Sequence, residues 1–247
     1  MGQDWRPNTA ISNVLLHKVL SFCELKNKKA AENFDETADW IVAGAYYATC
    51  YVCSLRGGPE GLLVDLAVLP ENIDQGNRNE ITVPLLGKVK GETDARQHLL
   101  HSVTVTSSNI LIKLWYQRML RVHQGYGRVQ GPAICCRKGF QLTLRVLNFK
   151  LWEALTKAWE EIPSLFLSNV KGVDDIEVHF NVYRSFRRGS NSRAIEQGLD
   201  KLVTDTVNRW KVLERAGGSR PGHGSMSQYY ADANLLKKVH LRYTFAM

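Results

Sequence analysis

The residue types of a phosphate site lie scattered along this chain of 247 residues. Arg187 belongs to an arginine-rich segment, Trp210 follows it by 23 residues, and Tyr230 follows Trp210 by a further 20 residues. A guanidinium can bond two phosphate oxygens at once and stays charged, and an indole N–H can donate to a phosphate oxygen. A tyrosine hydroxyl can attack phosphorus and hold it covalently. These residue types are those that could break and rejoin a phosphodiester without a metal ion.

Two further cations lie earlier in the chain. Arg56 follows an apolar helical pattern, with Glu60 four residues later, although an arginine at a helix end often does no more than face the helix dipole. Lys90 lies 34 residues after Arg56 in a predicted β-turn. An ammonium there could give its proton to a developing alkoxide, and Lys88 competes with Lys90 for that role. Most turn lysines are merely solvated, so the pattern alone leaves both interpretations open.

The order and spacing of these residues resemble those of the catalytic domain of tyrosine recombinases, the phage-integrase superfamily. Within that superfamily the chain is similar to the DIRS-like and Crypton-like recombinases of eukaryotic mobile elements. The resemblance covers roughly residues 37–236, and it rests on the order of the motifs, because each motif is only a few residues long. It implies site-specific cleavage and rejoining of double-stranded DNA through a covalent 3′-phosphotyrosine, as in the integration or excision of a mobile element.

The resemblance also assigns the residues of the site. Those implied to be catalytic are Arg56, Lys90, Arg184, Arg187, Trp210 and Tyr230, and those implied to contact the substrate or support the site are Glu60, Lys88, Arg188 and Tyr229. Arg184 stands where the family has histidine or lysine, and arginine cannot act as a general base near neutral pH. Tyr230 is preferred over Tyr229 as the nucleophile because it lies directly before Ala231.

The resemblance implies no cofactor and no metal ion, and it implies subunits that associate on DNA as dimers or tetramers. It implies an intracellular protein, located in the nucleus if the chain comes from a eukaryotic mobile element. Two other functions stay open. Arg184 and the long interval from Trp210 to Tyr230 also suit a DNA-binding protein that keeps the fold and has lost the chemistry. The net charge alone would suit a nucleic-acid-binding module unrelated to recombinases.

Three other features invite a functional interpretation. Residues 241–246 are similar to the family's segment around its second arginine, but they leave no room for a downstream tyrosine, so we interpret them as a packing segment. His223, in a glycine-rich segment, is an alternative to Trp210 and is more simply a solvent-exposed loop residue. Cys50 and Cys53 have the spacing of half a zinc site, but no second such pair exists. The apolar residues around them predict core cysteines.

Apolar spacing predicts the elements that position these residues. Helices are predicted over 10–26, 37–55, 109–124, 143–161, 186–198, 200–213 and 226–237, and short strands over 62–68, 80–86 and 99–106. The sequence thus predicts an α+β fold, mainly α-helical with a small antiparallel β-sheet, similar to a tyrosine-recombinase catalytic domain. We expect an N-terminal helical segment over 1–36, too short for a full core-binding domain, and the catalytic domain over 37–247.

Composition agrees with a DNA-binding protein inside the cell. Lys and Arg number 32 against 24 Asp and Glu, which gives a net charge of +8 that is spread along the chain. The odd number of cysteines, five, favours a reducing compartment over a disulfide framework. No apolar run approaches the ~18 residues of a membrane span, so we expect no membrane association.

Overall fold

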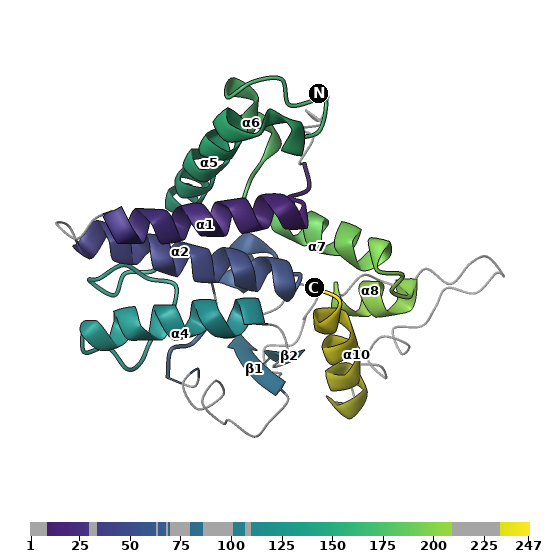
Figure 1. The fold of residues 1–247 in the computed structure, drawn as a ribbon. Helices are drawn as coiled ribbons and strands as arrows, with labels where there is room; N and C mark the ends of the chain where they lie inside the picture. Colours follow the sequence, from purple (N-terminus) through teal and green to yellow (C-terminus); the bar gives the residue numbers. More distant parts are fainter. Residues whose placement is uncertain are drawn as a thin grey trace, which may run out of the picture.

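The described part of the chain consists of helices and one two-stranded sheet. The computed structural model describes residues 9–29, 34–62, 64–67, 69, 80–85, 101–106, 110–208 and 233–247. The elements in chain order are α1 (Asn13–Lys29), α2 (Phe34–Val52), η1 (Gly57–Gly61), β1 (Glu80–Leu85), β2 (His101–Thr106), α4 (Ile110–Gly125), α5 (Leu144–Glu161), η2 (Pro163–Leu165), α6 (Asp174–His179), α7 (Ser185–Glu196), α8 (Lys201–Val207) and α10 (Ala233–Phe245) (Figure 1). None of the helices in these ranges combines the length and the apolar content that crossing a bilayer demands.

The centre of the fold is a helix that is buried on every side. α2 carries small and apolar residues all around its axis, and every residue from 40 to 55 is buried. Such a helix has no polar face for solvent, so it must be covered by other elements. α1 packs on one side of α2 and α4 on the other (Figure 1). Gly44 of α2 allows the close approach of α4, because the Trp115 ring occupies the space that a Cβ would fill.

α5 shows how a local pattern becomes a packed element. Thr143 caps its N-terminus, since the side-chain Oγ1 accepts a hydrogen bond from the backbone N–H of Val146 at 3.3 Å. Buried apolar residues then recur every three or four positions, at Leu147, Leu151, Ala154, Leu155 and Ala158. The helix that carries this apolar face packs against α1, and α6 follows beside α5 (Figure 1).

The first described residues lie across the start of α7. The backbone N–H of Thr9 donates to the carbonyl oxygen of His179 at 2.7 Å, and that of Ile11 donates to the carbonyl oxygen of Ser185 at 3.1 Å. Gly189 of α7 permits this contact, because a Cβ at that position would overlap the carbonyl oxygen of Ile11. α7 is therefore fixed by the segment before α1 as well as by its packing against α2.

Gly189→Ala is expected to lower the free energy of unfolding by about 2–3 kcal/mol, although alanine is the better helix former. The added methyl group would overlap a backbone carbonyl, which cannot rotate away as a side chain can. Chemical denaturation measures the change. Gly172→Ala is the control, because no atom lies within 4 Å of its Cβ position. Equal stability of Gly189→Ala and the wild type would mean that the segment around Ile11 does not rest on α7.

The two strands connect the C-terminal helix to the rest of the fold. β1 and β2 pair antiparallel, with Ile81 opposite Val105. α10 packs against β2, and the backbone N–H of Thr106 donates to the hydroxyl oxygen of Thr244 at 3.2 Å. α10 also contacts α8, so it lies between the sheet and the end of the α7–α8 pair (Figure 1, yellow).

The mainly helical class predicted from the sequence is confirmed, and the strand predicted over 62–68 is wrong. In the described residues of 62–68 there is no strand, only an isolated bridge between Asp65 and Pro132. α8 ends at Val207 instead of 213. Of the helix predicted over 226–237, residues 226–232 lie outside the described residues and residues 233–237 belong to α10, which continues to Phe245. Residues 241–246 therefore belong largely to a helix, whose role is described below.

The cysteines are core residues, as predicted. Cys50 lies in α2 and Cys53 directly after it, and both are buried. All five cysteines of the chain are free thiols. Across the described ranges no group of His, Cys, Asp and Glu side chains has the arrangement of a metal site.

Candidate functional site

The described residues include four of the side chains that the sequence nominates. Arg56, Arg184, Arg187 and Arg188 are described in full, whereas Glu60 is described only as backbone, in η1. The remaining nominated residues lie outside the described residues, and these are Lys88, Lys90, Trp210, Tyr229 and Tyr230. The structure therefore bears on how the arginine-bearing segments are arranged.

The segments that carry Arg56 and Arg184 touch each other, although 128 positions separate them (184 − 56). The backbone N–H of Gly57 donates to the carbonyl oxygen of Tyr183 at 3.4 Å. A Cβ on Gly57 would overlap the carbonyl oxygen of Val182, so the approach of the two backbones requires glycine. The residue after Arg56 is thus packed against the residues just before Arg184.

Arg187 points into the protein and binds the end of α8. Its exposed fraction is 7%, which is low for an arginine. Its Nε–H donates to Oδ1 of Asn208 at 2.8 Å, and its Nη2 donates to the backbone oxygen of the same residue. The guanidinium fork therefore fixes Asn208, which lies two positions before Trp210 in the sequence.

Ser54 joins the Arg56 segment to the same asparagine. Its hydroxyl donates to Oδ1 of Asn208 at 2.7 Å and lies 3.3 Å from Oδ1 of Asn191 in α7. Ser54 has a φ of +51°, and it is the one non-glycine residue with a positive φ among the described positions. This left-handed conformation is costly for serine, so the surrounding hydrogen bonds must hold it. Ser54 and Arg187 therefore both donate a hydrogen bond to Oδ1 of Asn208.

Tyr243 of α10 completes the cluster. Its side chain is fully buried, its hydroxyl lies 2.8 Å from the hydroxyl of Ser190, and it donates to Oδ1 of Asn191 at 3.1 Å. Burial raises the pKa of Tyr243, and the hydrogen bonds of Ser190 and Ser54 together with the positive charge of Arg187 oppose part of that rise. Segments from α2, α7, α8 and α10 therefore converge here. We call Ser54, Arg187, Ser190, Asn191, Asn208 and Tyr243 the polar cluster.

Arg184 and Arg188 lie on the surface beside this cluster. Both side chains are exposed, and the Arg184 guanidinium stands 5.9 Å from the centre of the Tyr183 ring. The backbone N–H of Arg188 donates to the carbonyl oxygen of Arg184 at 2.9 Å, which places the two residues one helical turn apart. Arg187 is thus the buried member of the arginine group, and its two neighbours present charge to solvent.

The sequence reasoning missed most of the polar cluster. Ser54, Ser190, Asn191 and Asn208 were not singled out, and Tyr243 was assigned to a packing segment. One signal was present in the sequence. The segment of α7 is rich in serine, arginine and asparagine and has few apolar residues. In the structure Ser185, Ser190 and Asn191 of this helix are nevertheless buried. A polar helix that must be covered needs hydrogen-bond partners on the covering elements.

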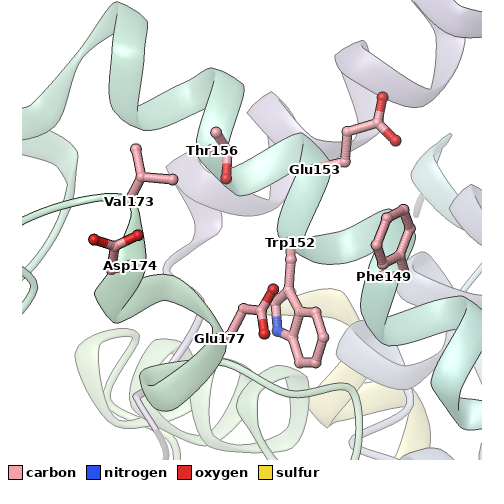
Figure 2. Close-up of a pocket in the computed structure, with 7 residues that line it drawn as sticks. All are labelled: Phe149, Trp152, Glu153, Thr156, Val173, Asp174 and Glu177. Atoms are coloured by element: carbon pink, nitrogen blue, oxygen red, sulfur yellow. The ribbon is translucent and has the colours of Figure 1, made fainter.

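A hollow of about 660 Å³ between α5 and α6 is a second candidate site (Figure 2). It is lined by Phe149, Trp152, Glu153, Thr156, Val173, Asp174 and Glu177. Its three carboxylates would repel a phosphate group. The indole N–H of Trp152 already donates to the carbonyl oxygen of Phe180 at 2.7 Å, so it anchors the chain after α6. This hollow does not have the chemistry of a nucleic-acid site.

Comparisons of the chain with known protein families, with curated proteins and with solved structures found no match.

Proposed function

We propose that this protein cleaves and rejoins DNA through a covalent 3′-phosphotyrosine intermediate, as a tyrosine recombinase does. The proposal is supported above all by one observation. Ser54, two residues before Arg56, shares the side-chain oxygen of Asn208 with Arg187, and Asn208 lies two residues before Trp210. The segments of Arg56 and Arg187 are therefore neighbours in space, and both are bonded to the residue two positions before Trp210. If these segments lay on opposite faces of the fold, their side chains could not contact the same phosphate group.

In the proposed reaction the hydroxyl oxygen of Tyr230 attacks the scissile phosphorus and loses its proton to water, because Arg184 cannot accept it. The bond from phosphorus to the 5′-oxygen breaks, and Lys90 gives that oxygen a proton. Arg56 and Arg187 stabilise the negative charge that grows on the non-bridging oxygens, Arg187 from the buried position in which it is bound to Asn208, and Trp210 donates a hydrogen bond to one of these oxygens. A 5′-hydroxyl then attacks the phosphorus and returns a proton to Lys90, the bond from phosphorus to the Tyr230 oxygen breaks, and the tyrosine regains a proton from water. One phosphodiester replaces another, so the reaction needs neither an external energy source nor a cofactor.

A DNA-binding protein that has lost this chemistry is the second candidate. It is favoured by Arg184, which occupies the position of the family's histidine or lysine and cannot take up the tyrosine proton. Its exposed guanidinium suits a contact with the DNA backbone instead. Both candidates act on double-stranded DNA, and the active form would assemble on it as a dimer or tetramer.

Covalent attachment separates the two candidates. The protein is incubated with nicked suicide duplexes, from which the cleaved strand diffuses away, and the products are separated under denaturing conditions. A covalent adduct whose DNA-linked peptide contains residues 226–231 supports the recombinase. A duplex that binds without forming any adduct identifies the second candidate. An adduct linked through another tyrosine would keep the reaction and change the nucleophile.

DNA binding by this chain is expected to be strongly salt-dependent. A protein that makes several lysine and arginine contacts with phosphates loses about a thousandfold in affinity between roughly 50 mM and 200 mM salt. The double variant Arg184→Ala, Arg188→Ala should lower the slope of log Kd against log salt by about two, one for each lost contact. Lys157→Ala is the control, because Lys157 pairs with Glu160 near the C-terminal end of α5. An unchanged slope in the double variant would remove both arginines from the DNA surface.

A further inference from the structure

We propose that Ser54, Asn208 and Tyr243 are positioning residues, which set the segments of Arg56 and Arg187 against each other in the geometry that cleavage needs. This inference rests on the proposed function. None of the three residues belongs to the set of side chains assigned to the DNA or to the reacting atoms. Their role would be to act through the two arginines, by way of the hydrogen bonds of the polar cluster.

Asn208 is the centre of these bonds because all of its side-chain capacity is used. Its Oδ1 accepts from the hydroxyl of Ser54 at 2.7 Å and from Nε–H of Arg187 at 2.8 Å. Its Nδ2 donates to Oδ1 of Asn191 at 2.6 Å and to the carbonyl oxygen of Thr204 at 2.7 Å. An amide offers two acceptor positions and two donors, and here each one has a partner. Asn208 can therefore adopt one orientation only, and that orientation fixes Arg187.

Ser54 connects the segment of Arg56 to Asn208. Its left-handed backbone turns the chain directly after α2, and its hydroxyl fixes that turn to Asn208. A serine held at a positive φ costs about 1 kcal/mol or more, which glycine would avoid. The structure therefore retains a hydroxyl at a position where the backbone conformation alone favours glycine. Such a cost is typical of a position that serves a function.

Tyr243 fixes the other side of the cluster. Its hydroxyl donates to Oδ1 of Asn191, the same oxygen that accepts from Nδ2 of Asn208. Its ring packs with Ala194, Val203 and Val207, so α10 is packed against both α7 and α8. Loss of the hydroxyl would leave this packing in place and would remove one of the hydrogen bonds that hold the side chain of Asn191. The effect would reach Arg187 through Asn208.

Ser54→Gly separates stability from positioning. The substitution relieves the left-handed strain, so the free energy of unfolding should not fall, but it removes the bond to Asn208. We expect the single-turnover rate of adduct formation, per folded protein, to fall about 10- to 100-fold, because a misplacement of about 1 Å has an effect of that size. The Kd for the duplex should change little. A rate equal to that of the wild type would overturn the role of Ser54.

Tyr243→Phe tests the other side of the cluster against a matched control. Tyr116→Phe also removes one fully buried hydroxyl that makes a hydrogen bond, in this case with Thr49 at 2.8 Å, outside the polar cluster. Both variants should lose similar stability, and only Tyr243→Phe should slow adduct formation, again about 10-fold or more. Equal rates per folded protein in the two variants would mean that Tyr243 is only a packing residue.

Side-chain NMR of Arg187 tests this inference without DNA and therefore independently of the proposed function. In the DNA-free protein the Nε–H signal of Arg187, assigned by its loss in Arg187→Lys, should exchange slowly with water. Ser54→Gly and Tyr243→Phe should shift this signal and speed its exchange, and Tyr116→Phe should not. If the wild type forms no adduct, the recombinase proposal fails, and these signals alone decide whether the three residues position Arg187. Unchanged signals in both cluster variants overturn the inference whatever the adduct assay shows.

Discussion

Tyr230→Phe is expected to abolish the covalent protein–DNA adduct and to leave DNA binding almost unchanged. The substitution removes one hydroxyl oxygen, which is the nucleophile of the proposed reaction, and removes little contact area with the DNA. The loss should therefore lie in the chemical step and not in affinity. Adduct formation on a nicked suicide duplex measures the first quantity, and a binding titration with an uncleavable duplex measures the second.

Tyr229→Phe is the matched control for this prediction. Residues adjacent on a helix point about 100° apart, so only one of the two tyrosines can face a given phosphate if the segment is helical. Tyr229→Phe should retain the adduct. If Tyr229→Phe is inactive and Tyr230→Phe is active, the reaction stands and the nucleophile is Tyr229. If both single variants form the adduct, the double variant decides whether the two tyrosines replace each other or another residue carries the DNA.

Arg187→Ala is expected to reduce the rate of adduct formation about 100- to 1000-fold, the usual effect of removing a group that stabilises transition-state charge. It should also lower the free energy of unfolding by about 1–3 kcal/mol, because Oδ1 and the backbone oxygen of buried Asn208 would each lose a donor. Single-turnover kinetics per folded protein and chemical denaturation measure the two effects separately.

Two further variants test which property of Arg187 the reaction requires, its charge or its contact with Asn208. Arg187→Lys keeps a positive charge but cannot form the two-pronged contact with Asn208, so it should restore little activity. Arg188→Ala removes the exposed neighbour and should weaken binding without lowering the rate at saturating DNA. Full activity of Arg187→Lys would mean that charge alone is required. Full activity of Arg187→Ala would remove this residue from the site.

The helices were predictable wherever the pattern that forms them is local. α5 was predicted over 143–161 and spans Leu144–Glu161, because its cap and its apolar spacing lie within the helix itself. α6, with six residues, is too short to show a period and was missed. The helical spacing of Val239 and Tyr243 was visible in the sequence, but that segment was judged by its likeness to a family motif. The continuation of α10 from 237 to Phe245 was missed for that reason.

The candidate site was predictable only through its charged residues. Arginines that stand near glycines and aromatic residues attract attention by type, and the segments of Arg56 and Arg187 were found in that way. Ser54, Asn191 and Asn208 are ordinary residues whose importance comes from partners far along the chain. Hydrogen bonds between residues so far apart in the sequence leave no repeating pattern in it, so they become visible only in the folded structure. Lys90, Trp210 and Tyr230 stay predictions.

The polar cluster also determines when during folding a competent site can exist. The contacts of Ser54 with Asn191 and Asn208 close segments of 137 and 154 residues, whereas α1 and α2 can pack as soon as a short connection folds back. The entropy of closing a loop grows with its length, so contacts of this span form after the local helical ones. A chain with a collapsed apolar core and no polar cluster would hold its arginines in no fixed arrangement. Under the proposed function, such an incompletely folded chain could bind DNA through its positive charge but could not cleave it. Cleavage would then be limited to chains that have completed folding.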